Sequence, residues 1–303
     1  MKKTKLSIVI LSYNTKDLLR SCLLSLEKVS DEVSFEVIIS DNGSADGSTQ
    51  MVEKDFPWVK KIIRNKQNIG FAAGNNKARY FAHGEYILFL NSDTVVYKNT
   101  LKEMIYYMDK NLAVGASTCK LVLPNGEPDK DARRSFVTPW TGLVHLFLKL
   151  DKIFPNSRLF SQYWYGYISP DATHEVDSLQ GAFFLTRKKI LDDVGWFDED
   201  YFLDAEDIDL SWRIKEKRWK IMYYPKVETL HVKGASKGKN NETKKKIPFK
   251  EKVKFRLSGV NSMELFVKKR VWNKYPLPLM LLVLFGIKAL KIIRFVKLLI
   301  TER

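Results

Sequence analysis

The chain has 303 residues, 45% of them hydrophobic, which is enough for one large domain or for one domain with an appendage. Its two cysteines, Cys22 and Cys119, exclude a disulfide framework, and the first residues lack the small-residue cleavage site of a secretory signal. The net charge is +16, but residues 1–231 carry a balance of only +1 and residues 232–303 a balance of +15. A near-neutral globular part with a basic tail indicates a polyanionic partner, either a membrane surface or a nucleic acid.

In the first hundred residues, apolar runs alternate with helical patterns. The runs at 6–11, 35–39, 59–63 and 86–90 are β-rich and continuous rather than alternating between apolar and polar residues, which is typical of parallel strands covered on both faces. A helical stripe at 18–26 separates the first two, and a small-residue helix opens at 68–76 between the last two. This is the βαβαβ pattern of the nucleotide-binding half of a doubly wound α/β fold.

The rest of the chain is less regular. We expect a helix at 101–108, a strand at 114–123 and a turn at 124–126, followed by an inserted lid or acceptor-facing region at 136–175. A strand at 179–186, a helix at 206–218 and a strand at 220–224 that stops at Pro225 complete the pattern. Residues 233–254 are predicted to be a polar, flexible connection.

Residues 41–48 read Asp-Asn-Gly-Ser-Ala-Asp-Gly-Ser directly after the second predicted strand. Open α/β sheets bind ligands at the carboxyl ends of their strands. A phosphate-binding loop would offer glycines and a lysine, whereas this loop begins with the carboxylate of Asp41. A carboxylate accepts hydrogen bonds from a pyrimidine ring N–H or a ribose hydroxyl, so the loop indicates a nucleotide recognised by its base and sugar.

Two other acidic stretches lie at the ends of predicted elements. Asp93, in Asn91-Ser92-Asp93 after the fourth strand, could hold Mg²⁺ or Mn²⁺ against a diphosphate, or the three residues could merely form a turn. Glu206, Asp207 and Asp209 open a helix, and three carboxylates exceed what the helix dipole requires. One of them is therefore a candidate catalytic base.

The basic candidates are less specific. Arg213 could pair with one of these acids or reach a phosphate, and Arg133-Arg134 could be solvated surface or could bind an acceptor phosphate. A lone histidine such as His231 is more often a structural residue, but its place between a strand and the tail leaves a role in binding a metal or a diphosphate open.

The C-terminal segment is apolar and basic. Residues 277–287 carry no charge, and Lys288, Lys291, Arg294 and Lys297 then alternate with apolar residues. A spanning helix needs about 20 apolar residues. A basic amphipathic helix lying in a membrane interface therefore fits better, and the alternative is a helix docked on the domain.

Read together, these segments resemble the GT-A-fold glycosyltransferases of family 2, in the bacterial rhamnosyltransferase-like branch. The resemblance covers about 230 residues, from Ser7-Ile-Val-Ile-Leu-Ser-Tyr-Asn14 to His231-Val-Lys-Gly234. It implies a mixed, mainly parallel Rossmann-like sheet with helices on both faces and an inverting transfer from a nucleotide-activated sugar. The implied catalytic residues are Asp207 as base with Glu206 beside it, and the implied metal ligands are Asp93 and His231. The implied nucleotide-sugar contacts are Tyr13, Asn14, Asp41, Asn68, Asn91, Asp93 and Arg213.

Two departures from the family pattern stand out. The first acid of the family's D-x-D element is Asn91 here, a weaker metal ligand. Relatives usually end the helix after the Glu-Asp element with glycine before an aromatic residue, whereas this chain has Arg218-Trp219.

The sequence thus predicts a catalytic domain at 1–232, with a donor half at 1–123 and an acceptor and base half at 124–232, and a membrane-associating tail at 233–303. The expected activity is transfer of one sugar, with dTDP-rhamnose as first guess, to a polyprenyl-diphosphate-linked glycan in cell-surface polysaccharide synthesis. The expected location is peripheral, on the cytoplasmic face of the plasma membrane.

Two alternatives remain. A sugar nucleotidyltransferase would need a glycine-rich loop after the first strand, which residues 11–16 lack. A nucleic-acid-binding protein would use the basic tail. The apolar terminal helix favours lipid, so we expect no nucleic-acid partner.

Overall fold

The computed structural model describes residues 4–233 and 249–301. In this part of the chain one mixed sheet has the strand order β3-β2-β1-β4-β10-β6-β11-β5, and β8 also pairs with β11. Its strands are β1 (Leu6–Ser12), β2 (Phe35–Asp41), β3 (Lys61–Arg64), β4 (Tyr86–Asn91), β5 (Thr94–Val96), β6 (Val114–Val122), β8 (His174–Glu175), β10 (Phe183–Arg187) and β11 (Lys220–His231). A separate ribbon pairs β7 (Arg133–Arg134) with β9 (Ser178–Leu179).

The sheet is mainly parallel, as predicted. β1 pairs in parallel with β2 and β4, β2 with β3, and β6 with β11. β10 lies antiparallel between β4 and β6. β1 and β4 are buried along almost their whole length, which explains why their sequences are continuously apolar.

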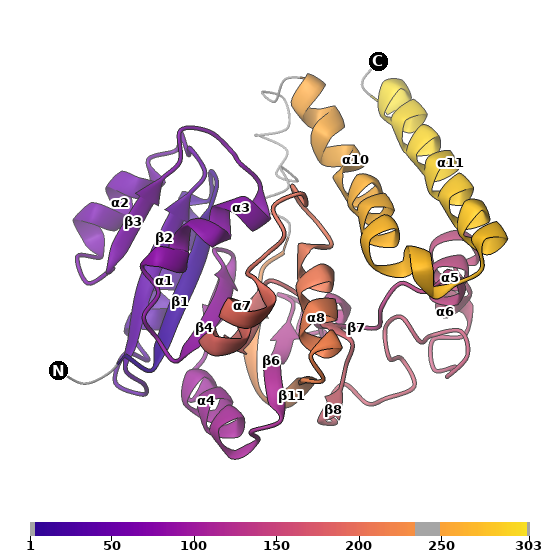
Figure 1. The fold of residues 1–303 in the computed structure, drawn as a ribbon. Coiled ribbons are helices and arrows are strands. Elements are labelled where there is room, and N and C mark those ends of the chain that lie inside the picture. The colour runs from indigo at the N-terminus through magenta and orange to yellow at the C-terminus, as the bar shows by residue number, and fades with distance from the viewer. Residues whose placement is uncertain (1–3, 234–248, 302–303) are drawn as a thin grey trace.

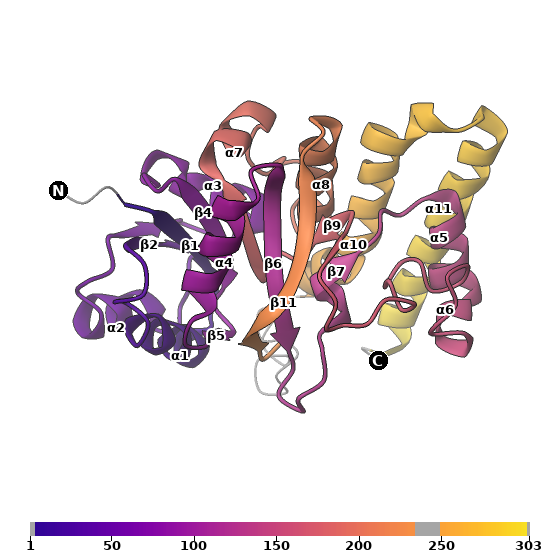
Figure 2. The ribbon, with the colours of Figure 1, turned by 90° about the horizontal axis from the view of Figure 1, so that it is seen from below.

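Helices cover both faces of the sheet. They include α1 (Lys16–Glu27), α2 (Ser48–Asp55), α3 (Phe71–Asn76), η1 (Lys77–Tyr80), α4 (Thr100–Lys110), α7 (Lys188–Val194) and α8 (Glu206–Glu216). Figure 2 shows α7 and α8 on one face, and α1 and α2 on the other. The predicted α/β architecture is confirmed.

The region at 136–175, predicted to be irregular, contains the short helices α5 (Pro139–Gly142), η3 (Leu143–Leu148) and α6 (Leu150–Ile153) and the two-residue strand β8. The helix η2 (Lys130–Ala132) precedes it. Figure 1 shows α5 and α6 beside the C-terminal helix, away from the sheet.

Two predicted strands differ from the structure. β11 does not stop at Pro225 but runs on to His231, because its pairing with β6 shifts register between Tyr224 and Glu228. A proline without an N–H is tolerated at such an irregularity. The predicted strand at 179–186 is divided between β9 and β10, which belong to different sheets, and the residues between them are left free to line a cavity.

The C-terminal extension is α10 (Phe249–Phe266), η4 (Val267–Val271), η5 (Trp272–Lys274) and α11 (Leu277–Thr301), and α10 and α11 form an antiparallel hairpin (Figure 1). The predicted flexible connection is wrong for 249–254, which are helical, and its residues 234–248 lie outside the described part. Within the described residues no helix is both long and apolar enough to cross a membrane. The extension shares a hydrophobic cluster with Tyr201 and Ile208 of the preceding chain.

Candidate active site

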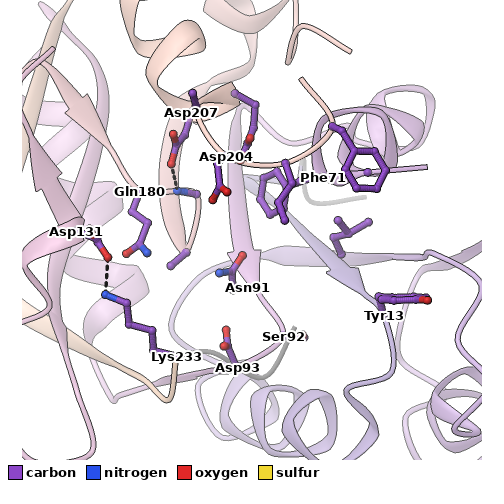
Figure 3. Close-up of a pocket in the computed structure, with 18 of the residues that line it drawn as sticks. Tyr13, Phe71, Asn91, Ser92, Asp93, Asp131, Gln180, Asp204, Asp207 and Lys233 are labelled. Carbon is purple, nitrogen blue, oxygen red and sulfur yellow. Dashed lines mark hydrogen bonds and ion pairs between the residues drawn. The ribbon is translucent and has the colours of Figure 1, made fainter. Parts of the chain in front are cut away.

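Most of the predicted site residues line one cavity of about 380 Å³ at the carboxyl ends of β1 and β4 (Figure 3). Its other walls come from the 180–182 segment, the 202–207 segment, the end of β11 and Phe255 of α10. Seven of the residues predicted from the sequence line it: Tyr13, Asn68, Asn91, Asp93, Glu206, Asp207 and His231. The structure therefore brings together polar and charged side chains from chain segments more than 200 residues apart.

Asp41 and Asn14, which were predicted to contact the nucleotide sugar, do not line this cavity but hold the loop after β2. Asp41 Oδ2 accepts hydrogen bonds from the backbone N–H groups of Gly43 and Ser44, at 3.1 and 2.9 Å. Its Oδ1 is buried and has no hydrogen-bond partner in the described chain. Asn14 accepts a hydrogen bond from Ala45 N at 2.8 Å and so ties the end of β1 to the loop. Asn42, directly after Asp41, lines the cavity.

Gly70 joins this loop to the opposite wall. Asn42 Nδ2 donates to Gly70 O at 3.0 Å, and Phe71 N donates to Phe202 O at 2.7 Å. Gly70 has a φ of +94°, and a Cβ at this position would lie 2.5 Å from Phe202 O. Only glycine permits this contact.

Asp93 and His231 face each other at the floor of the cavity, and both are buried. His231 Nε2 lies 3.5 Å from Asp93 Oδ1, an oxygen with no hydrogen-bond partner in the described chain. His231 Nδ1 lies 2.8 Å from Asp129 Oδ2, and Val232 N donates to Asp93 O. Asp129 thus orients the imidazole so that Nε2 points to Asp93.

The pKa values of His231 and Asp129 are set by the charged side chains beside them. Burial alone would lower the pKa of His231, but its hydrogen bond with Asp129 and the nearby Asp93 raise it to about 9. Burial would likewise raise the pKa of Asp129, whereas hydrogen bonds from His231 and Lys233 hold it at about 2. Lys233 Nζ bridges Asp129 and Asp131 at the cavity wall (Figure 3). No three His, Cys, Asp or Glu side chains in the described ranges are grouped to hold a metal by themselves.

Asp207 projects into the cavity from the first turn of α8 (Figure 3). Its Oδ2 accepts hydrogen bonds from Arg134 Nη2 at 2.7 Å and from Gly181 N at 3.1 Å, and its Oδ1 accepts one from Ile208 N at 2.8 Å. A carboxylate has about four acceptor positions. One position therefore remains for a proton donor in the cavity.

The arginine pair is not solvated surface. Arg133 is buried and donates to Ser169 O and Ile168 O. Arg134 donates to Leu179 O at 3.0 Å as well as to Asp207. Asp207 raises the pKa of the Arg134 guanidinium although burial opposes its charge.

The residues before α8 are held by the C-terminal extension. Asp204 and Ala205 have φ values of +68° and +65°, a conformation that costs non-glycine residues energy. Ser258 Oγ of α10 donates to Asp204 Oδ2, and Ser262 Oγ donates to Leu203 O. The C-terminal extension therefore supports the loop that leads into α8 and its candidate base, Asp207.

Arg213 does not line the cavity, so its prediction as a ligand of the nucleotide sugar is not supported. Its guanidinium donates to the carbonyl oxygens of Val194, Gly195 and Trp196 and to Asp209 Oδ2. The alternative that it pairs with an acid of its own helix holds. Arg270 of η4 donates to the other oxygen of Asp209, so this carboxylate is structural.

Sequence reasoning missed the charged wall residues Asp131, Asp204 and Lys233, and it missed Asp129, which contacts His231 without lining the cavity. Lys233 follows His231 closely and could have been suspected from that proximity. Asp129 lies 102 residues from His231, and only the pairing of β6 with β11 brings them together.

Comparisons with known proteins give one consistent result. A sequence model of glycosyl transferase family 2 matches residues 7–195. The uncharacterized glycosyltransferase YfnE of Bacillus subtilis (strain 168) is 38% identical over 115 residues, which cover 36% of this chain and 29% of that protein. The N-acetylglucosaminyl-diphospho-decaprenol L-rhamnosyltransferase of Mycobacterium tuberculosis is 26% identical over 247 residues, 78% of each chain.

The fold is also similar to solved structures. Mannosyltransferase PcManGT from Pyrobaculum calidifontis, solved in complex with GDP-Man and Mn²⁺, superposes with a TM-score of 0.57 at 15% identity. The superposition covers 89% of this chain and 65% of that one. The architecture is the GT-A fold expected from the sequence.

Proposed function

This chain belongs to glycosyl transferase family 2, and we propose that it is an inverting enzyme that transfers one sugar from a nucleoside-diphosphate sugar to a lipid-linked glycan. The observation that carries the proposal is that Asp93, His231 and Asp207 line one and the same cavity. The rhamnosyltransferase relative makes dTDP-rhamnose the first donor to test.

The donor's base and ribose would lie between Tyr13, Asn68 and the loop after β2. The support is Asp41, whose buried Oδ1 has no hydrogen-bond partner in the described residues. A pyrimidine N–H is a suitable donor for such an oxygen, since an unpaired buried carboxylate oxygen is costly. Asn14 and Gly43 hold the loop in place for this contact.

Asp93 and His231 would hold a divalent cation, Mg²⁺ or Mn²⁺, together with oxygens of the donor's diphosphate. The residues fit such an ion, because Asp93 Oδ1 has no hydrogen-bond partner among the described residues and Asp129 keeps His231 Nε2 directed toward it at 3.5 Å. When bound, the cation neutralises charge that develops on the leaving diphosphate. The PcManGT complex with Mn²⁺ is consistent with this assignment.

Asp207 would act as general base. It accepts the proton of the acceptor hydroxyl while that oxygen bonds to the anomeric carbon and the bond to the diphosphate breaks. A single displacement inverts the anomeric configuration. Arg134 and Gly181 N hold the carboxylate in one orientation, and Glu206 adds a second acid at the wall.

The acceptor is proposed to be a glycan on polyprenyl diphosphate, as the name of the mycobacterial relative states for that protein. The protein would lie peripherally on the cytoplasmic face of an anionic membrane and would use residues 233–303 for contact. The 19 basic and 4 acidic residues of 232–303 support this contact. Residues 1–232 would form the catalytic domain.

The test is a screen of nucleotide sugars by thermal shift, followed by product mass. With the donor identified, Asp207→Asn should lower kcat by about 10²- to 10⁴-fold and leave donor affinity unchanged. Asp193→Asn, at a half-exposed carboxylate outside the cavity, is the matched control. Wild-type turnover in Asp207→Asn would refute the assignment of the base, and activity unaffected by EDTA would refute the metal site.

A further inference from the structure

A second, apolar hollow of about 270 Å³ lies between the α5–η3 segment and the C-terminal helices. Leu143 and Phe147 form one wall, Met263 of α10 lies at its base, and Leu282 and Phe285 of α11 form the other wall. Figures 1 and 2 both show α5 against α11, far along the chain from each other. We call this hollow the apolar groove.

The groove is bounded where η3 meets α11. A Cβ on Gly286 would lie 2.9 Å from Phe147 Cζ, so the phenyl ring packs directly against the helix at this glycine. Beyond that contact the groove stays open, and Leu143, Leu282 and Phe285 are 44%, 65% and 71% exposed. Several large exposed apolar side chains around one hollow mark a binding surface rather than scattered surface residues.

Two chain segments connect the groove to the catalytic cavity. Arg134 lines the cavity, and Val137, three residues later, lines the groove. On α10, Phe255 lines the cavity and Met263 lines the groove, eight residues and about 12 Å further along the helix. The two hollows have no lining residue in common, but both are built on these two segments. An elongated molecule with a polar head in the cavity and an apolar chain in the groove spans such a distance.

Charge around the groove suits such a molecule. α11 continues from the groove wall into Lys288, Lys291 and Arg294, and Lys149 follows η3 directly. These cations are complementary to a diphosphate and to anionic headgroups around it.

We infer that the apolar groove binds the isoprenoid chain of the acceptor while the acceptor's sugar lies at Asp207. The inference rests on the proposed function, because it requires an acceptor that carries a lipid. A bilayer acyl chain or a second copy of this protein would fill the groove without any link to the cavity, whereas the two chain segments that contribute residues to both hollows favour one occupant for both.

The test uses the full-length protein in detergent and a farnesyl diphosphate analogue with a photoreactive benzophenone at its tail. We expect labelling within 137–147 and 277–287. Excess farnesyl diphosphate should suppress the labelling, and neither pyrophosphate nor phosphatidylglycerol should do so. Labelling confined to other segments, or competition by phosphatidylglycerol, would overturn the inference.

Variants of α11 separate the groove from a general lipid surface. Phe285→Glu and Leu282→Glu place a carboxylate at the groove, and Ile292→Glu, at a 64% exposed position outside it, is the control. The groove variants should lose at least about tenfold in labelling and raise KM at least about tenfold for a polyprenyl-linked acceptor. Their KM for a short benzyl-diphosphate sugar should not change, and Ile292→Glu should behave as wild type. Equal effects at Ile292, or crosslinks between two copies through the groove, would contradict the inference.

The same experiments distinguish the two proposals. Groove labelling without sugar transfer to any acceptor would refute the function and leave the lipid site standing. Normal transfer to the short acceptor without groove labelling would refute the lipid site alone.

Discussion

Replacing Arg134 by methionine removes the cation that faces Asp207. The two side chains are 12% and 8% exposed, and Arg134 Nη2 lies 2.7 Å from Asp207 Oδ2. Loss of one partner from a buried ion pair costs about 3–5 kcal/mol, because the other charge stays buried. Gly181 N and Ile208 N still donate to Asp207, so we expect the lower end, about 3 kcal/mol.

Equilibrium unfolding in urea measures this effect in a double-mutant cycle. Arg134→Met should lower the free energy of unfolding, and adding Asp207→Asn to it should restore about 1–2 kcal/mol by removing the unpaired carboxylate. The kcat of Arg134→Met should also fall, since Asp207 loses its orienting partner. A loss below about 1 kcal/mol without recovery in the double variant would show that the pair is not formed as described.

Three further results are expected. Asp129→Asn should raise the Mn²⁺ concentration for half-maximal activity about 10- to 100-fold, because the imidazole of His231 loses its orienting carboxylate; an unchanged metal titration would contradict this. Arg218→Gly should stabilise the protein by about 1 kcal/mol in thermal or urea unfolding, because Arg218 has a φ of +64°, and Lys217→Gly, at −83°, should instead destabilise it. Burial would raise the pKa of Asp198, but a hydrogen bond from a lysine of η4 lowers it. The melting-temperature advantage of wild type over Asp198→Asn should therefore be complete above the ordinary carboxyl pKa of about 4 and vanish as pH falls through the lower folded value, and an advantage that grows on acidification would refute this.

The sequence predicted best what depends on neighbouring residues. The apolar run at 6–11 has no polar alternation, so it could only be a strand covered on both faces, and it is β1. The carboxyl ends of parallel strands share one edge of a sheet, which is why Tyr13 and Asn91 could be expected in one cavity. The excess of acid at a helix start indicated the carboxylates of 206–209, and the family resemblance singled out Asp207 among them.

What the sequence could not predict depends on distant pairing. Asp129 reaches His231 because the loop after β6 lies beside the end of β11. Arg134 reaches Asp207 because β7 pairs with β9, two residues per strand, too short for any periodic signal. Arg218 ends α8 with hydrogen bonds from Arg218 N to Lys215 O and from Trp219 N to Ile214 O, although the family resemblance led us to expect glycine there. At this position, tertiary packing outweighs the local preference of a left-handed backbone for glycine.

The hydrogen bonds from Ser258 and Ser262 to the 203–204 backbone and side chain have a practical consequence. Exchanging the tail for an unrelated membrane anchor would remove part of the support of the loop before Asp207. An experiment meant to change only membrane targeting would therefore also change catalysis. Any chimera of this enzyme must therefore keep α10, together with η4, whose Arg270 bonds Asp209, and the part of α11 that lines the apolar groove.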